Sequence, residues 1–380
     1  MKIHKDEFGP EYVIEVSDAS IGMEGFLVID NTAIGPGKGG VRMTPDVTAH
    51  EVSRLARAMT WKNALAGIPF GGAKSGIRWP GGDDELKKQF VQSFARAIKP
   101  FTPKKYITAP DVNAAEKEMQ WFVEGTGDWQ SATGKPSDLC MSVFGSPGEK
   151  CGIPHEYGST GFGVAHVTKV AAGVYGIDLK NATVAIEGFG NVGSFAYKHL
   201  REMGATIVAV SDKDGAIYSK EGFDNEKLTK ISEERKSVLE YEGAEKLSHA
   251  EIFGLEVDIL IPASITDVIN DSNKDNIKAK LIIEAANIPM TEETEKYLHE
   301  KGIIVVPDFV ANSGGVISSY AEYRGFNPDK MFELVEDKIT KSAKAVLEKS
   351  KHTHAWPREV GLQLAQEKVR SVMEKVPTVF

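Results

Sequence analysis

Several features that define other protein classes are scarce in this chain. Among its 380 residues are only two cysteines, Cys140 and Cys151, which cannot form the disulfide framework of a small secreted domain. The sequence has no Cys-x-x-Cys pair and no histidine-rich cluster, so we expect no metal site. No apolar run reaches the roughly 18 residues that a membrane-spanning helix needs, so we expect no membrane contact.

An excess of positive charge is also lacking. The formal net charge of −9 at pH 7 argues against a nucleic-acid partner, and an anionic cofactor must then be met by local positive charge. The first residues, MKIHKDEFGPEY, contain no apolar stretch of the kind found in a signal peptide. With 41% hydrophobic and 26% charged residues the composition is that of a globular protein, and the length predicts two domains. We therefore expect a cytoplasmic enzyme or binding protein.

The pattern of residues 1–155 predicts an α/β domain. Residues 23–30 (MEGFLVID) have the character of a strand, and the following IGPGKGG that of a loop. Thr48 and Glu51 fit a capping box, which predicts the start of a helix. The apolar positions of that helix fall on one face: Val52, Leu55, Ala56 and Met59.

The pattern changes near Ser159. Residues 162–174 predict a helix, and short apolar runs follow at regular intervals: ATVAIEG, ATIVAVSD, VDILIPA, KLIIEAA and GIIVVPD. Continuous apolar strands that alternate with helices predict a doubly wound parallel sheet, here a Rossmann-type dinucleotide-binding domain over residues 156–344. The tail has a helical pattern broken at Pro357, and we expect residues 345–380 to pack back on the first domain.

A dinucleotide fingerprint lies between a predicted strand and a predicted helix. Gly188 allows the tight turn, Gly190 lets the backbone approach a pyrophosphate, and Gly193 allows close packing of helix on strand. Asn191 and Val192 begin the helix, whose free N–H groups would face the phosphates. The alternative is a glycine-rich turn without a ligand.

An acidic residue stands where it can choose between the two nicotinamide cofactors. Asp212 ends the next predicted strand, 19 residues after Gly193, and such an acid binds a ribose 2′-hydroxyl. It favours NAD because it would repel a 2′-phosphate, although the adjacent Lys213 could pair with that phosphate and leaves NADP possible.

Three lysines occupy unusual surroundings. Lys38 lies in GPGKGG, Lys62 continues the apolar stripe of its helix, and Lys74 lies in PFGGAKSGI. Their ordinary roles would be an exposed loop lysine, a lysine whose stem lies along apolar surface, and a loop charge, respectively. The functional interpretation is a pocket for an anionic substrate, in which two ammonium groups bind carboxylates and a third has a lowered pKa.

A carboxylate partner follows the predicted strand KKYITAP. Asp111 could cap the next helix, but Asn113 with Glu116 is the better predicted cap. We therefore interpret Asp111 as a general acid and base beside a lysine.

The motifs together resemble the glutamate/leucine/phenylalanine/valine dehydrogenase family. They are GPGKGGVRM, MTWKNALAGIPFGGAKSGI, APDVN, GFGNVG, AAN and PDFVANSGGVISS, in family order from about residue 35 to 325. The resemblance implies a substrate domain, a dinucleotide domain and a cleft between them that closes for hydride transfer. It also implies the reversible conversion of an L-amino acid to a 2-oxo acid and ammonium with NAD(P).

The resemblance also implies roles for single residues. Lys74 would be the catalytic lysine, Asp111 the proton-transferring acid, and Lys62 the residue that holds the α-carboxylate. Asn287 and Thr160 would lie at the cofactor, and Asn312 near nicotinamide and substrate. The family forms hexamers, so we expect a homohexamer.

The substrate prediction depends on Lys38 and Ser319. In the glutamate enzymes of the family a lysine and a serine at these positions meet the side-chain carboxylate, and a buried lysine without an anion would be costly. Glutamate is therefore favoured over leucine or valine, and a non-catalytic regulatory subunit is a further alternative. His155 and Glu156 depart from the family's glutamate members, which leaves room for another substrate or another regulation; the ordinary role of His155 is structural.

Overall fold

The computed structural model describes residues 3–140 and 151–375, and these form two compact units. In the described residues, the first unit comprises 3–140, 151–157, 316–334 and 363–375, and the second comprises 158–315 and 335–362. The predicted boundaries differ in three segments, since 156–157 and 316–334 lie in the first unit and 345–362 in the second. Three helices run continuously across these boundaries, and helical periodicity does not mark where a helix changes its packing partner.

The sheet of the first unit has six strands among the described residues, in the order β1-β2-β5-β3-β6 with β4 beside β5. The strands are β1 (Tyr12–Asp18), β2 (Met23–Asn31), β3 (Gly37–Lys38), β4 (Val41–Thr44), β5 (Gly71–Arg78) and β6 (Tyr106–Ile107). β1, β2 and β5 are antiparallel neighbours, whereas β3, β4 and β6 join the sheet in parallel register. The predicted strand at 23–30 is confirmed as β2, and the predicted loop around Lys38 contains the short strand β3.

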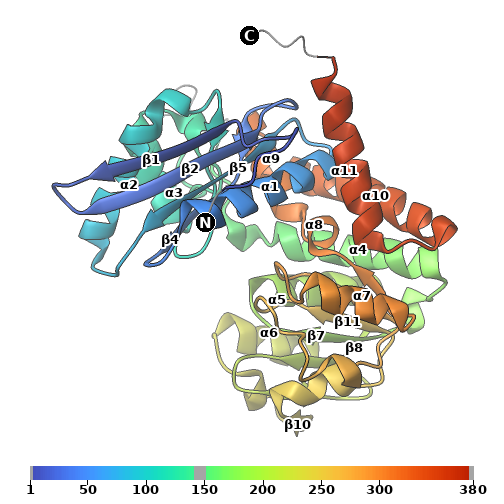
Figure 1. The fold of residues 1–380 in the computed structure, drawn as a ribbon. Coiled ribbons are helices and arrows are strands. Elements are labelled where there is room, and N and C mark those ends of the chain that lie inside the picture. The colour runs from blue at the N-terminus through green and yellow to red at the C-terminus, as the bar shows by residue number, and fades with distance from the viewer. Residues whose placement is uncertain (1–2, 141–150, 376–380) are drawn as a thin grey trace. The chain divides into compact units, whose positions relative to one another are not determined.

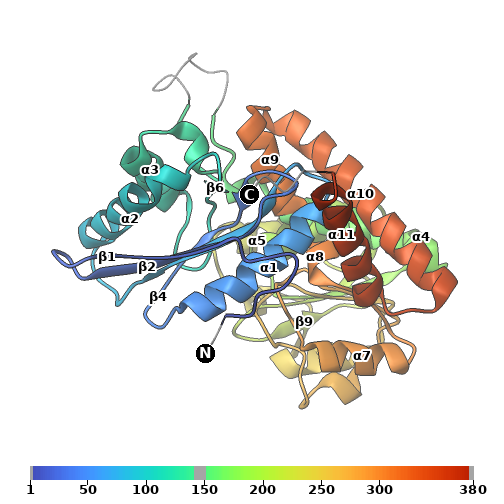
Figure 2. The ribbon, with the colours of Figure 1, turned by 45° about the horizontal axis from the view of Figure 1, so that its top comes forward.

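Alternation along β2 assigns its two faces to different helices. Leu27 and Ile29 pack with α2 (Asp84–Ile98) and α3 (Glu116–Thr126), whereas Phe26 and Val28 pack with α1 (Ala49–Leu65). Figure 2 shows α2 and α3 on one side of β1 and β2 and α1 on the other. Thr48 caps α1 by accepting the Glu51 N–H, as predicted.

The second unit contains the predicted doubly wound sheet. Its strand order in the described residues is β10-β9-β8-β7-β11-β12-β13. The five strands β8, β7, β11, β12 and β13 are parallel, whereas β9 pairs antiparallel with β8, and β10 antiparallel with β9. The strands are β7 (Thr183–Glu187), β8 (Thr206–Ser211), β9 (Ala216–Tyr218), β10 (Glu245–Leu247), β11 (Ile259–Pro262), β12 (Leu281–Ile283) and β13 (Ile304–Val306). The chain order reverses between β7 and β11, which is the position where open α/β sheets bind ligands.

Helices surround this sheet (Figure 1). They are α4 (Ser159–Tyr175), α5 (Asn191–Glu202), α6 (Asn225–Glu233), α7 (Glu292–Glu300) and α8 (Asp308–Ala311). Three helices, α9 (Gly314–Arg324), α10 (Pro328–Thr353) and α11 (Pro357–Met373), continue from one unit into the other. Pro357 begins α11, where its missing N–H costs nothing, so the break predicted at this proline is confirmed.

Two further findings concern membranes and cysteines. None of the helices in 3–140 and 151–375 is both long and apolar enough to span a bilayer.

Cys140 and Cys151 are joined by one disulfide bond, which was not predicted from the sequence.

Candidate functional site

Lys74 and Asp111 form an ion pair in the first unit. Lys74 Nζ lies 2.8 Å from Asp111 Oδ2, and Lys74 is only 7% exposed. Arg42 of β4 approaches the same oxygen, with Nε 3.3 Å away, and also pairs with Glu51 at 2.6 Å. Burial raises the pKa of Asp111, but Lys74 and Arg42 together lower it more, so the pKa lies below its usual value. The carboxylate is thus held ionised beside an ammonium group from which it can accept a proton.

Lys74 lies on a strand, so the alternative interpretation of Lys74 as a loop charge is wrong. It is part of β5 and pairs with Val28 of β2. Gly72 and Gly76, two positions away on either side, share its face of the sheet. A Cβ on Gly72 would lie 2.0 Å from Thr60 Oγ1, and one on Gly76 would lie 2.6 Å from Val47 Cγ2. The glycines are therefore needed because α1 and the segment before it pack directly on the strand around Lys74.

Lys62 lies half-buried in the last turn of α1. The next residue, Asn63, donates its amide hydrogens to the carbonyl of Lys38 at 3.3 Å and to that of Gly71 at 2.6 Å. Asn63 thereby fastens the end of α1 to β3 and β5. The structure thus places the three predicted lysines on three adjoining elements.

Lys38 is the most deeply buried of the three lysines, with 1% of its surface exposed. Its Nζ donates to the carbonyl oxygen of Thr108 at 3.0 Å. Burial lowers the pKa of Lys38 to about 7; Glu322 opposes that change, and Lys135 and Lys74 add to it. A lysine of lowered pKa was predicted without its position, and the structure assigns that property to Lys38.

A further buried lysine, Lys135, was missed in the sequence. Lys135 and Glu322 form an ion pair in which both side chains are fully buried, and the ammonium lies over the Trp129 ring, 3.6 Å from its centroid. Glu322 also accepts the backbone N–H groups of Gly134 at 2.7 Å and Ile153 at 2.8 Å. The available signal was a lysine within an otherwise small and polar stretch, SATGKPS.

Glu322 lies on α9, one turn after Ser319. Residues three apart on a helix share a face, so Ser319 and the acid that acts electrostatically on Lys38 point in a common direction. Phe70, directly before β5, packs edge-on against Tyr320 and Tyr323 of the same helix at 5.7 and 5.4 Å. The predicted residue Ser319 is therefore carried by a helix that adjoins the strands bearing the lysines.

The predicted cap at Asn113 is wrong. Asn113 has a φ of 55°, whereas a capping residue needs an extended backbone. The helix begins two residues later than predicted, and Glu118 accepts the N–H of Ala115 at 2.8 Å. Asn113 instead donates to the carbonyl of Met43 at 3.0 Å and ties the Asp111 loop to β4.

The predicted glycine fingerprint lies at the carboxyl end of β7. Gly188 has a φ of 92°, and a Cβ on Gly193 would lie 2.0 Å from the Gly188 carbonyl oxygen. Gly190 precedes α5, and a Cβ there would meet no atom of the described residues within 4 Å. Gly188 and Gly193 thus serve the turn and its packing, and Gly190 leaves open space beside the helix N-terminus of Asn191 and Val192. These features fit a bound pyrophosphate.

Asp212 follows β8 directly and organises the backbone around it. Oδ1 accepts the N–H groups of Asp214 at 2.8 Å and Gly215 at 3.2 Å, and Oδ2 accepts that of Val238 at 2.7 Å. The adjacent Lys213 is highly exposed and pairs with Asp214 at 3.0 Å. Asp212 therefore has a structural role that the spacing argument did not foresee.

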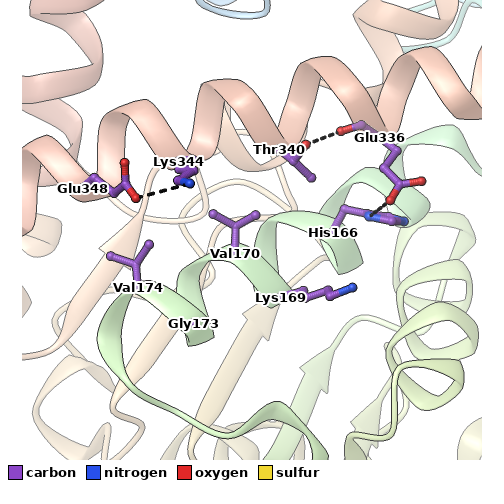
Figure 3. Close-up of a pocket in the computed structure, with 9 residues that line it drawn as sticks. All are labelled: His166, Lys169, Val170, Gly173, Val174, Glu336, Thr340, Lys344 and Glu348. Carbon is purple, nitrogen blue, oxygen red and sulfur yellow. Dashed lines mark hydrogen bonds and ion pairs between the residues drawn. The ribbon is translucent and has the colours of Figure 1, made fainter.

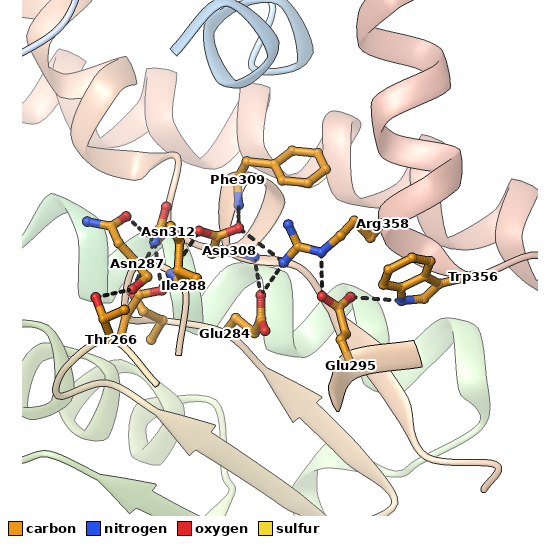
Figure 4. A network of polar contacts seen from close by, with 12 residues as sticks. Thr266, Glu284, Asn287, Ile288, Glu295, Asp308, Phe309, Asn312, Trp356 and Arg358 are labelled. Carbon is orange, nitrogen blue, oxygen red and sulfur yellow. Dashed lines mark hydrogen bonds and ion pairs between the residues drawn. The ribbon is translucent and has the colours of Figure 1, made fainter. Parts of the chain in front are cut away.

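Asn287 and Asn312 contact each other in the second unit, as Figure 4 shows. Asn312 Nδ2 lies 3.0 Å from Asn287 Oδ1 and 3.2 Å from the carbonyls of Ala285 and Ala286. Asn312 is buried and Asn287 is exposed, so the buried amide orients the exposed one. Thr160 lies in the first turn of α4 and is 8% exposed.

A shallow groove of about 420 Å³ between α4 and α10 includes none of the predicted residues. Figure 3 shows His166 and Lys169 of α4 opposite Glu336 of α10, with His166 Nδ1 3.5 Å from Glu336 Oε1. Its composition of paired charges is typical of a solvated helix junction.

His155 and Glu156 are both exposed and lie in a short 3₁₀ helix. Burial raises the pKa of Glu116, and the charge of the nearby Glu156 raises it further.

Comparisons with known proteins agree over most of the chain. Residues 151–376 match the family described as Glutamate/Leucine/Phenylalanine/Valine dehydrogenase, and residues 10–127 match its dimerisation domain. A glutamate dehydrogenase of Aeropyrum pernix is 41% identical over 83% of this chain and 77% of that protein. An NADP-specific glutamate dehydrogenase of Saccharolobus shibatae is 36% identical over 96% and 89%.

A solved structure gives the same result for the fold. The hetero-hexameric glutamate dehydrogenase from Thermus thermophilus, in its Leu-bound form, has a TM-score of 0.81 and 28% identity. The match covers 96% of this chain and 90% of that one.

Proposed function

Because the chain belongs to the Glutamate/Leucine/Phenylalanine/Valine dehydrogenase family, we propose that it oxidises L-glutamate to 2-oxoglutarate and ammonium. The predicted resemblance and the predicted class of enzyme, a nicotinamide-dependent amino-acid dehydrogenase, are confirmed. The balanced reaction consumes glutamate, NAD(P)⁺ and water, and yields 2-oxoglutarate, ammonium, NAD(P)H and a proton. The ion pair between Lys74 and Asp111 is the observation that carries the proposal.

In the proposed mechanism the lysines bind and the Lys74–Asp111 pair moves protons. Lys62 holds the α-carboxylate, and Lys38 with Ser319 holds the side-chain carboxylate. Lys74 polarises the carbon–nitrogen or carbon–oxygen bond and activates water, while Asp111 accepts and returns the proton. The bound nicotinamide supplies the hydride acceptor. Lys38 is buried and donates only to the neutral carbonyl of Thr108, so it would reject leucine, whose side chain brings no negative charge to pair with it.

The cofactor is a nicotinamide dinucleotide, and we propose NAD as the preferred form. Gly188, Gly190 and Gly193 would bind the pyrophosphate with the N-terminus of α5, including Asn191 and Val192. Asp212 would accept the ribose 2′-hydroxyl, and its carboxylate would repel a 2′-phosphate. Thr160, Asn287 and Asn312 would lie at the nicotinamide end.

The family and the Thermus neighbour support an oligomer, and we propose a homohexamer. The cytoplasmic location stays a prediction. A substrate panel of L-amino acids, assayed with both NAD and NADP, tests the function directly. We expect turnover of glutamate with NAD; turnover of leucine or valine in place of glutamate would contradict the proposal.

A further inference from the structure

A buried cluster of charges lies in the second unit, around Arg358 in the first turn of α11 (Figure 4). Arg358 pairs with Glu284 at 2.9 Å, with Asp308 at 3.4 Å, and with Glu295, whose other oxygen accepts Trp356 Nε1 at 2.9 Å. Glu284 and Glu295 are fully buried, and Arg358 and Asp308 are 8% and 9% exposed. Burying these charges costs free energy of desolvation, so stability alone does not explain why the cluster is present.

Asp308 connects this cluster to a strained turn. Its Oδ1 faces Arg358 and accepts the Phe309 N–H at 2.8 Å, while its Oδ2 accepts the N–H of Ile288 at 3.1 Å. Ile288 has a φ of 49°, a left-handed conformation that a β-branched residue adopts only at a cost. Asp267 donates its N–H to the carbonyl of Ile288 at 2.9 Å, so the residue is held from both sides.

The strained turn places Asn287. Thr266 Oγ1 donates to the Asn287 carbonyl at 3.2 Å, and Asn312 Nδ2 donates to its side-chain oxygen at 3.0 Å. Asn312 is itself joined to Asp308, because its N–H donates to the Asp308 carbonyl at 2.9 Å. Asp308 therefore contacts Asn312 through its backbone carbonyl and Ile288, the residue after Asn287, through its carboxylate.

We propose that Asp308, held by Arg358, is a positioning residue that sets the Asn287–Asn312 pair for cofactor binding. The inference rests on the proposed function, which assigns both asparagines to the cofactor. Asp308 accepts the Ile288 N–H and thereby stabilises the left-handed backbone conformation of Ile288, which is unfavourable for a β-branched residue. The strain is thus stored beside the binding residue and is offset by the buried cluster.

The test uses an isosteric change and a matched control. In the wild-type protein one oxygen of Asp308 accepts the Ile288 N–H and the other accepts from Arg358 and the Phe309 N–H. In Asp308→Asn one of these two atoms becomes an NH₂ donor, so the side chain can no longer accept on both sides. Asp258→Asn is the control: Asp258 likewise binds a backbone N–H, that of Thr183 at 2.9 Å, and a cation, Lys280 at 2.7 Å, but at the amino end of β7. Both variants should lower the thermal stability of the full-length protein.

Cofactor binding should separate the two variants. We expect Asp308→Asn to raise the KM and Kd for NAD about tenfold with the KM for glutamate little changed, and Asp258→Asn to leave both KM values as they are. In an Ile288→Gly background, where a positive φ is not strained, the effect of Asp308→Asn on NAD binding should be clearly smaller.

Unchanged NAD binding in Asp308→Asn would overturn the inference, and so would an equal rise of the KM for NAD and the KM for glutamate. It would also be overturned if the effects of Asp308→Asn and Ile288→Gly on NAD binding simply multiplied in the double variant. These outcomes are distinct from failure of the proposed function. If the wild-type protein bound NAD without glutamate turnover, the proposed reaction would be wrong while the coupling between Asp308 and Ile288 could still be measured.

Discussion

Lys38 Nζ donates a hydrogen bond of 3.0 Å to the carbonyl of Thr108, and the residue has only 1% of its surface exposed. A neutral acceptor satisfies one of the three ammonium hydrogens but does not balance the charge. The acid that acts on it electrostatically, Glu322, is already paired with Lys135. Lys38 is therefore prepared for an anion that arrives with the substrate.

The first prediction concerns that anion. Lys38→Met should raise the KM for glutamate by roughly 10- to 100-fold, the loss expected for a charge-assisted hydrogen bond. In the wild-type protein the KM should also rise with pH above about 7, where Lys38 loses its proton. Initial rates across pH 6 to 9 for both proteins check this. A pH-dependent KM that persists unchanged in Lys38→Met would contradict the assignment.

The same lysine should leave a signature in stability. Its folded pKa of about 7 lies below the usual 10.5, so between these values the unfolded chain binds more protons than the folded chain. Stability from this group is therefore lowest below pH 7 and rises as the pH increases toward 10.5, by at most about 5 kcal/mol. Lys38→Met should lack that rise. Parallel denaturant unfolding curves of the two ligand-free proteins at pH 6.5 and 9.5 provide the comparison.

Lys74 can be tested for proton transfer separately from charge. Lys74→Ala should lower kcat by a factor of about 10² to 10⁴, the range for general acid–base catalysis. Lys74→Arg keeps a positive charge near Asp111 but cannot release its proton, so we expect it to be similarly impaired. NAD binding, measured by fluorescence, should be retained in both. Full turnover in Lys74→Arg would show that only charge is needed.

Arg42 should control the acid limb of the activity profile. Together with Lys74 it lowers the pKa of Asp111 against the effect of burial. Replacing it in Arg42→Gln removes one of the two cations, so the Asp111 pKa rises and kcat/KM should begin to fall at a higher pH on acidification. Arg78→Gln serves as a control, because Arg78 pairs with Glu24 near the end of β5 and not with Asp111. Equal profiles for Arg42→Gln and the wild type would exclude this role.

Glu295 should make the second unit less stable as the pH rises. Burial raises the pKa of Glu295 to about 7, although Arg358 opposes this change. The folded protein thus binds more protons than the unfolded chain between pH 4.5 and 7, and the stability from this group is lost as the pH rises through that range. Glu295→Gln should remove this loss. Thermal unfolding of both proteins at pH 5 and pH 7.5 measures the difference, and an unchanged difference would refute it.

Much of the fold could be predicted because its signals are local. The apolar runs that form β7, β8, β11, β12 and β13 lie between turn residues, and each is buried in the sheet. Thr48 and the glycine fingerprint act within a few residues of themselves. The prediction of a cap at Asn113 was wrong for the opposite reason: its side chain donates a hydrogen bond to the carbonyl of Met43, which is 70 residues away in sequence.

The sequence by itself determined the two kinds of domain, the family, and the residue types that carry the chemistry, since motif order and periodicity are properties of the chain alone. Only the tertiary structure decided which charges meet. Arg42 reaches Asp111, Lys135 meets Glu322, and Asp308 connects Arg358 to Ile288. These contacts join segments up to 187 residues apart, 322 minus 135, and depend on burial and direction, which no local pattern records. The pKa of Lys38 likewise follows from packing around it and not from its neighbours in sequence.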